Sequence, residues 1–316
     1  MKSALLTIAV SLPMLAAGVD PALLALAAPD ARVLAGVQVS QAQSTPIGQT
    51  LMAQIQLDSA TNKAMADAGF DLRRDLREIL VTISAEGSGN VMLFGRGSFH
   101  PAKIAAAGAS AGATSSIYRG VVLLEGKGSG ASGPNASGAI AFLDDSTMLA
   151  GDTASIKAAI DRHTAGTAFS GPLAIRARQI AIGNDVWLVT LTPPASAPSA
   201  AASDSAFGPL GNVLQSAVQV SMGLKFTATE ATLSAEVLTR SSQDAQSMVD
   251  VLKFFVQMTQ KNRPPGSNPP SSPSLADAAQ ISATGSTMHV MISVPQQELQ
   301  QFLLPGANPP KKLAAR

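Results

Sequence analysis

Two short segments of the chain have almost the same sequence, PIGQTL at 46–51 and PLGNVL at 209–214. Each follows a strand-like run and begins a stretch in which apolar residues have helical spacing. Such a repeat indicates that one α/β unit was duplicated, and chance similarity among alanine, serine and glycine is the alternative. We therefore predict an α+β fold of two sequence-related repeats, each with mainly antiparallel strands and with helices packed on the sheet.

The elements around the two segments follow the same order in both halves. A proline-led apolar turn comes first, at 21–26 and at 172–182, and a strand follows it at 32–39 and at 185–191. After each segment, one pair of strands leads into a helix, and then a second pair leads into another. These strands are expected at 78–85, 91–99, 139–143 and 147–150, then at 217–226, 231–239, 281–284 and 287–294, with closing helices at 154–163 and 296–303.

Proline and apolar spacing mark the helices. Apolar residues between 245 and 259 recur three and four apart, which predicts an amphipathic helix beginning after Ser241 or Ser242. Proline suits the first helical turn because its missing N–H would have no partner there. Four prolines stand where a strand leads into a helix: Pro46, Pro101, Pro209 and Pro295.

Gly48 and Gly211 each lie one turn into a predicted helix. Glycine inside a helix costs up to about 1 kcal/mol relative to alanine. We therefore expect the backbone to pack closely at both positions, so that a bulkier residue there lowers stability.

The N-terminus has the layout of a secretory leader, a positive residue followed by an uncharged apolar run over 4–17 that ends in small residues. Because 21–26 has a counterpart at 172–177, we expect cleavage near Ala17 or Gly18, and an uncleaved anchor is the alternative. No cysteine follows the run, which excludes a lipid-modified N-terminus. The sequence thus predicts a bacterial protein that is periplasmic or secreted.

The predicted division of the chain is a signal peptide at 1–18, a first repeat at 19–165, a second repeat at 166–304 and a disordered tail at 305–316. A basic tether to anionic surfaces is the alternative role of the tail. Segments rich in proline, serine, alanine or glycine are expected to form surface loops because they cannot pack a core. They lie at 126–138, 193–205 and 263–274.

Composition limits the classes of partner. The chain has no cysteine, so neither disulfides nor thiol chemistry contribute. Its formal charge of +1 falls to about zero once the leader is removed, which argues against nucleic-acid binding. One tryptophan and one tyrosine are few for a sugar-stacking surface, whereas ten phenylalanines suffice for an apolar core or groove. Membrane contact is expected only through an uncleaved N-terminal segment.

The segment 108–112, GASAG, spells the nucleophile elbow of serine hydrolases around Ser110. That motif requires a strand before the serine and a helix after it, whereas here a predicted helix precedes and a strand follows. Asp152 and either His163 or His289 stand downstream in an order that a hydrolase could use. A secreted serine hydrolase using Ser110 is therefore the alternative function, and a turn of small residues is the favoured interpretation.

Other chemical motifs fail in context. The segment 128–133 has the letters of a dinucleotide fingerprint, but a strand follows it in place of the required helix. The three histidines are far apart in sequence, so a histidine-based metal site has little support. Asp144 and Asp145 lie between two strands, where acidic side chains usually bond their own backbone in a turn. We therefore predict no catalytic, cofactor-binding or metal-binding residues.

Six charged residues of both signs gather just before the strand at 78–85. Their mixed signs favour a solvated, salt-bridged approach to that strand, and an anion-binding patch is the alternative. They are Asp71, Arg73, Arg74, Asp75, Arg77 and Glu78.

Several segments resemble uncharacterised exported bacterial proteins that carry a domain of unknown function. They are PDARVLAGV at 29–37, STPIGQ at 44–49, RDLRE at 74–78, GRGSF at 95–99, AGD at 150–152 and, more weakly, the helix at 242–260. The resemblance covers most of the first half. It implies an exported location and a fold, and it transfers no catalytic residue because that family has no assigned activity.

Together these features predict a non-catalytic binding or scaffold protein of the bacterial envelope. Its two repeats would present a sheet surface, or the cleft between them, to an envelope protein or an apolar ligand. A structural subunit that acts only within an assembly is a third possibility beside the hydrolase.

Overall fold

Alternating burial defines the strands of this protein. The computed structural model describes residues 18–55, 59–84, 90–127, 137–191, 216–261, 278–296 and 298. Along Leu76–Ser84, buried side chains alternate with more exposed ones, as the two-residue period of a strand requires. The strands are β1 (Ala31–Gln38), β2 (Leu76–Ser84), β3 (Val91–Gly97), β4 (Thr114–Tyr118), β5 (Val121–Lys127), β6 (Ser137–Asp144), β7 (Thr147–Asp152), β8 (Val186–Thr190), β9 (Ala217–Phe226), β10 (Glu230–Thr239), β11 (Ala279–Thr284) and β12 (Thr287–Pro295).

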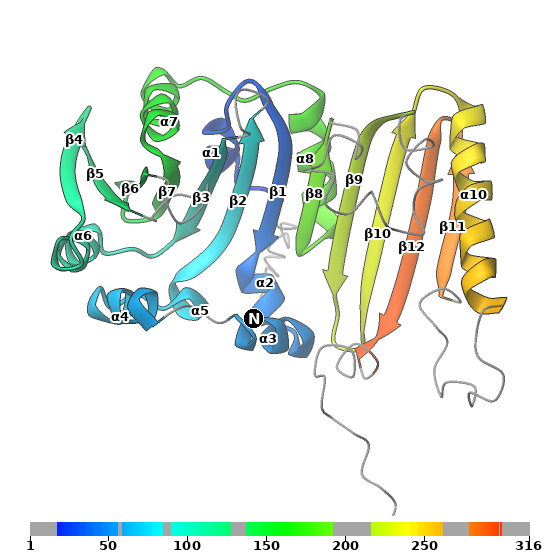
Figure 1. Ribbon diagram of the computed structural model, residues 1–316, viewed down its shortest axis with the longest axis horizontal. Coiled ribbons are helices and arrows are strands. Elements are labelled where there is room, and N and C mark those ends of the chain that lie inside the picture. Colours follow the sequence, from blue (N-terminus) through cyan, green and yellow to red (C-terminus); the bar gives the residue numbers. More distant parts are fainter. Residues whose placement is uncertain are drawn as a thin grey trace, which may run out of the picture.

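These strands pair into one 12-stranded sheet in the order β11-β12-β10-β9-β8-β1-β2-β3-β7-β6-β5-β4 (Figure 1). Each neighbouring pair is antiparallel. The α+β class with mainly antiparallel strands is therefore confirmed. Both predicted halves contribute to the same sheet, and they meet where β1 pairs with β8.

Outward from that junction, the two halves have the same strand order. The first half runs β1-β2-β3-β7-β6 and the second runs β8-β9-β10-β12-β11, while β5 and β4 extend the first half alone. The similar segment at 209–214 lies outside the described residues, as do 1–17, the middle of the predicted loop at 126–138, the whole of the predicted loops at 193–205 and 263–274, nearly all of the closing helix at 296–303 and the tail at 305–316. The sequence relation between the halves stays a prediction.

The described helices begin at the signals that the sequence contains. Thr45 accepts a hydrogen bond from the backbone N–H of Gly48, and Asp152 accepts one from Ser155, so each caps a helix. Pro46 and Pro101 stand in the first turn of their helices, as predicted, whereas Pro295 ends a strand. The helices are α1 (Pro21–Ala25), α2 (Val39–Gln43), α3 (Pro46–Ala53), α4 (Ser59–Asp67), α5 (Leu72–Asp75), α6 (Pro101–Ser110), α7 (Thr153–Ala165), α8 (Pro172–Gly183) and α10 (Ser242–Lys261).

The main core lies between one face of the sheet and helices α1, α7 and α8. Leu34, Leu80 and Phe94 are fully buried on this face. They belong to one cluster with side chains from the three helices, such as Ile156 of α7 and Ala177 of α8. Burial of these apolar side chains is the main stabilising contribution to the first half and to the junction.

Helix α10 covers the opposite face at one end of the sheet. Its Met248 and Val249 pack against Val237 of β10 and Met288 of β12. Residues paired directly across strands point to the same face of the sheet, and the pairing runs from Val237 through Val220 and Thr190 to Val33. Val33 is the chain neighbour of Leu34 and therefore points to the other face. Helix α10 thus lies on the face opposite to the main core. Figure 1 shows α10 beside β11, with α4 and α6 near the far end of the sheet.

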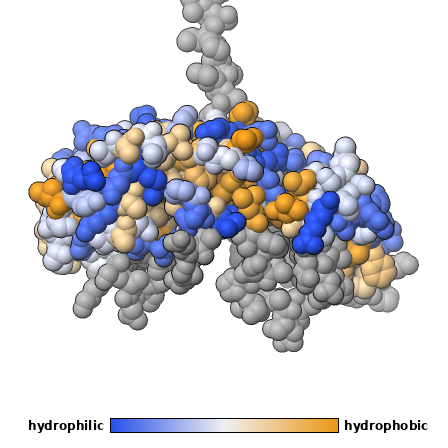
Figure 2. All heavy atoms as spheres, turned by 90° about the horizontal axis from the view of Figure 1, so that it is seen from above, coloured by the Kyte–Doolittle hydropathy of each residue, from blue (hydrophilic) through white to orange (hydrophobic). Residues whose placement is uncertain are grey.

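Apolar side chains also continue across the middle of this second face. Ala35 of β1, Val81 of β2 and Leu93 of β3 are paired across neighbouring strands there, and all three are half-buried. Seen from above, the largest group of hydrophobic residues lies near the middle of the molecule (Figure 2). Both faces of the sheet are therefore apolar, and the second face is the one that the helices cover only in part.

Candidate functional site

The structure does not assemble a catalytic triad around Ser110. This residue ends α6, is exposed, and donates its hydroxyl hydrogen bond to the carbonyl of Ala106 at 3.0 Å. Asp152 caps the N-terminus of α7, His163 lies in the last turn of that helix, and His289 lies on β12. Among the described residues, no histidine or carboxylate bonds to Ser110, so the hydrolase alternative lacks its base.

The GASAG segment instead forms one wall of an apolar cavity. Gly108, Ala111 and Gly112 line it together with Ala107 of the same helix. The small side chains of this segment leave open space beside α6, and Gly108 has no side chain to fill that space. The favoured interpretation of the segment as a turn of small residues holds only for Ala111 and Gly112, because its first three residues form the last turn of α6; a strand, β4, follows.

This apolar cavity has a volume of about 970 Å³ and lies between α4 and α6 on one side and β5, β6 and β7 on the other. Its size falls at the upper end of ordinary ligand pockets, about 300 to 1,000 Å³. The register connects Phe142 and Met148 of its floor to Ile79 of β2 and Val37 of β1, which places the cavity on the same face as α10. It is lined by Ala64, Met65, Ala68, Phe70, Phe99, Ile104, Ala107, Gly108, Ala111, Gly112, Ala113, Thr114, Leu124, Glu125, Gly126, Ile140, Phe142 and Met148.

Three phenylalanines give the cavity a rigid side. The ring of Phe99 lies 5.6 Å from that of Phe70 and 5.4 Å from that of Phe142, centroid to centroid. Such stacked and tilted pairs hold aromatic rings in place. Phe99 is buried, whereas Phe70 and Phe142 are half-buried and border the open space.

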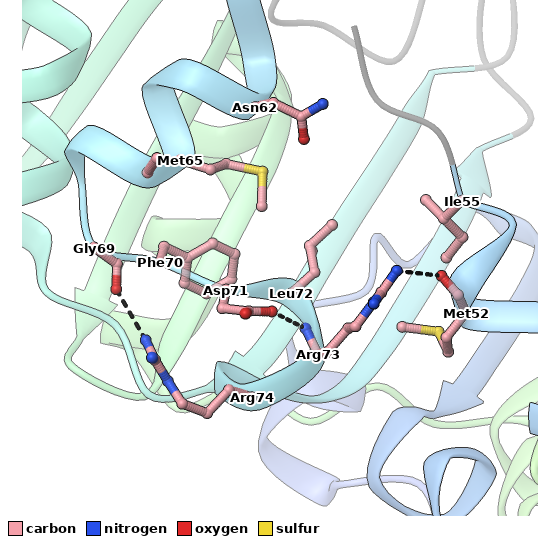
Figure 3. Close-up of a pocket in the computed structure, with 11 residues that line it drawn as sticks. Met52, Ile55, Asn62, Met65, Gly69, Phe70, Asp71, Leu72, Arg73 and Arg74 are labelled. Atoms are coloured by element: carbon pink, nitrogen blue, oxygen red, sulfur yellow. Dashed lines mark hydrogen bonds between the residues drawn. The ribbon is translucent and has the colours of Figure 1, made fainter. Parts of the chain in front are cut away.

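A smaller side cavity of about 450 Å³ adjoins the apolar cavity. Met65 and Phe70 line both, so the two spaces share a wall. Figure 3 shows Asn62 and Met65 on one side of it and Ile55 with Arg73 on the other. Unlike the apolar cavity, the side cavity brings arginine side chains to its lining.

Two members of the charge cluster before β2 neutralise each other, and a third caps a helix. Arg74 forms an ion pair with Asp75, and this hydrogen-bonded arginine lowers the pKa of Asp75 to about 2. Asp71 caps α5 by accepting a hydrogen bond from the backbone N–H of Arg73 at 2.8 Å. The predicted salt-bridged approach to the strand is therefore confirmed for these residues.

Arg73 differs from its neighbours. Its guanidinium donates to the carbonyl of Met52 at 3.4 Å, and within the described ranges no carboxylate lies within ion-pair distance of it. The side chain is exposed and lines the side cavity. A cation with most of its donors unused therefore stands beside the shared wall.

Asp144 forms the predicted turn. It accepts hydrogen bonds from the backbone N–H of Ser146 at 2.6 Å and from the hydroxyl of Ser146 at 2.7 Å. Burial raises the pKa of Asp144, but these bonds and one from Thr147 outweigh it, so the pKa lies below its usual value. Its carboxylate is thus engaged in local structure.

A polar cluster lies in the second half on the face of the sheet that α8 covers, and no sequence motif predicted it. Arg176 of α8 pairs with Glu236 of β10 and donates to the hydroxyl of Ser221 at 3.0 Å. His289 Nδ1 lies 3.9 Å from the same glutamate. The three partners come from separate strands, so only the sheet register brings them together.

Comparisons with known proteins bear on the fold. No family model matches the sequence, and no curated protein matches it significantly. Crystal forms III and IV of TP0453 give TM-scores of 0.54 at 11% and 12% identity, and crystal form I gives 0.50 at 13%. The matches cover 90% or 91% of this chain and 98% of the TP0453 chains. The chain has a fold similar to that of TP0453. At these identities the likeness shows the fold alone.

Two further findings concern the described residues only. None of their helices is both long enough and apolar enough to cross a membrane. In the same part of the chain, no three histidine, aspartate or glutamate side chains gather in a way that could hold a metal ion.

Proposed function

We propose that this chain is a non-catalytic, exported binding protein that holds an apolar ligand in the cavity between α4, α6 and strands β5 to β7. The observation that carries the proposal is the lining of that cavity, in which Glu125 is the sole charged residue among those described. The space opens to solvent, since lining residues such as Ala111 and Thr114 are exposed. An accessible space of about 970 Å³ with mostly apolar walls has the size and character of a ligand pocket.

The cavity walls favour a flexible chain over a polar or charged group. Small residues of α6 face methionine and phenylalanine side chains across the space. Methionine side chains adapt to irregular apolar shapes because they are unbranched and polarizable. An alkyl chain would remove apolar surface from water on both sides without leaving any buried polar group of the protein unpaired.

The proposal of export rests on the N-terminal leader pattern and on the contacts of the residues that follow it. The carbonyl of Gly18 accepts a hydrogen bond from the Gln38 side chain at 3.2 Å, and the backbone N–H of Asp20 donates to Glu78 at 3.0 Å. These bonds support cleavage on the N-terminal side of Gly18, because the chain from there on takes part in the fold.

The proposal of an internal duplication rests on the segments at 46–51 and 209–214 together with the matching strand order of the two halves. An antiparallel junction between β1 and β8, each the first strand of its half, is what a two-fold arrangement of repeats would give. The first half would then have gained β4 and β5, which border the cavity side of the sheet.

Calorimetric titration with 1-dodecanol tests the binding function. Gly108→Leu should abolish binding, because a Cβ at this position meets only ordinary contacts, 3.7 Å from Ala113 and Leu124, and the rest of the side chain would enter the cavity. Ala109→Leu is the matched control, since Ala109 is exposed and does not line the cavity. No binding by the parent protein, or equal binding by Gly108→Leu, contradicts the proposal.

A further inference from the structure

A polar or charged group beside an apolar cavity can fix the orientation of a bound ligand. Among the described residues, arginines line the side cavity but not the apolar cavity. Glu125 is part of the lining of the apolar cavity, but its register with Ala139 places its side chain on the face of the main core, where it accepts a hydrogen bond from Ser116 at 3.1 Å. Arg73 lines the adjoining side cavity. A negative group on the ligand would find no cation in the apolar cavity and would be attracted to Arg73 in the side cavity.

The two cavities adjoin at a shared wall. Met65 and Phe70 border both spaces, so a chain in the apolar cavity that passes these two side chains reaches the lining that contains Arg73 (Figure 3). Met65 is flexible enough to adapt to such a passage.

Resting on the proposed function, we infer that the ligand is a single-chain amphiphile with one negative charge, a long-chain carboxylate, whose head group pairs with Arg73. A guanidinium has five donors and binds a carboxylate through two parallel hydrogen bonds. The backbone carbonyl of Met52 engages Arg73 at 3.4 Å and leaves most of these donors for a ligand.

The neighbouring charges favour a head group with one charge over one with two. Arg74 also lines the side cavity, but its guanidinium is held by Asp75 and by the carbonyl of Gly69. Asp71 stands on the same wall, where its carboxylate accepts the N–H of Arg73. One available cation with a carboxylate nearby suits a monoanion, whereas a dianionic phosphate would need a second cation.

The experiment compares laurate with 1-dodecanol by calorimetric titration at pH 8, where the carboxylate of laurate is ionised. The parent protein should bind laurate about tenfold or more tightly than 1-dodecanol, as a charge-assisted hydrogen-bonded pair allows. Arg73→Gln should remove this preference by weakening laurate binding about tenfold or more, with a much smaller effect on 1-dodecanol. Arg77→Gln, a change of an exposed arginine outside both cavities, should retain the preference.

The outcomes separate this inference from the proposed function. Equal affinities for the two ligands, or a preference that survives Arg73→Gln, overturn the carboxylate inference and leave an apolar binding protein. Tighter binding of dodecyl phosphate than of laurate overturns the single-charge head group. Absence of binding by either laurate or 1-dodecanol overturns both the inference and the proposed function.

Discussion

Gly36 of β1 and Trp187 of β8 are paired directly across the junction of the two halves, and the indole ring occupies the space that a Cβ on Gly36 would need. Trp187 is 1% exposed and belongs to the main core. Because Gly36 has no side chain, the indole ring of Trp187 packs directly against the backbone of β1. This packing lets β1 pair with β8 and join the two halves into one sheet.

Replacing Gly36 with alanine should therefore destabilise the protein. The new methyl group would overlap the indole and force it or the strands to move, which typically costs about 1 to 3 kcal/mol. Gly183→Ala is the control, because a Cβ there meets nothing within 4 Å. Chemical denaturation followed by the fluorescence of Trp187, the one tryptophan in the sequence, measures both variants. Equal midpoints for Gly36→Ala and the control contradict the tight junction.

Gly48→Ala should also lower stability, by about 2 kcal/mol or more, since its Cβ would overlap the backbone carbonyl of Ala42. Close packing at Gly48 is thereby confirmed, while Gly211 lies outside the described residues. Gln49→Ala, in the same helix but exposed, is the comparison. A thermal melt in which Gly48→Ala matches the parent protein would disprove the steric argument.

A fluorophosphonate probe should not label Ser110, because its hydroxyl bonds to the helix backbone and meets no described base. The parent protein and Ser110→Ala should give the same blank result in gel fluorescence, with a known serine hydrolase as positive control. Stoichiometric labelling that Ser110→Ala removes would restore the hydrolase alternative.

Glu78 should make the protein less stable as the pH rises from acid toward neutral. Burial raises the pKa of Glu78 above its usual value, although hydrogen bonds from Asp20 and Gln38 oppose the shift. The folded state thus keeps its proton to higher pH than the unfolded state, so the free energy of unfolding falls as the pH rises through and above the usual pKa of a glutamate. Asp75, with a pKa of about 2 in the folded state, adds an opposite slope below about pH 5, where its carboxyl in the unfolded chain is still partly protonated, and adds none above it.

Glu78→Gln should flatten that fall, because glutamine has no proton to lose. Denaturant melts at several pH values between about 4 and 7 measure the slope, and Asp67→Asn on the exposed face of α4 serves as a control. A slope that is the same in the parent protein and in Glu78→Gln would show that burial of this carboxyl does not control the pH dependence.

Strands and helices with strong local signals were predictable from the sequence. The strand at 217–226 has the predicted bounds, and α7 begins beside its predicted cap Asp152. Val39 was predicted to end the first strand, but it begins α2. A strand was expected after the GASAG segment, but the bounds of the edge strand β4 could not be predicted, because its side chains are exposed or half-exposed and burial does not alternate along it. Helix α4 was missed because SATNKAMAD has no apolar stripe.

The candidate site could not be predicted for a different reason. Its cavity forms where α4 and α6, which are more than thirty residues apart in sequence, pack near β5 to β7, and no local pattern reveals such a space. The GASAG segment did carry a signal, the absence of side-chain volume on one helix face. The run of small residues also has the letters of a catalytic motif. Only the tertiary structure shows that these residues line the cavity.

Methionine methyl NMR tests the central claim most directly, because Met65 and Met148 line the apolar cavity whereas Met248 and Met288 lie in the core beneath α10. In a titration with 1-dodecanol, the account predicts that the methyl signals of Met65 and Met148 shift together and saturably, while those of Met248 and Met288 stay in place. Saturable shifts at Met248 and Met288 alone, or no shift at any of the four, would contradict it.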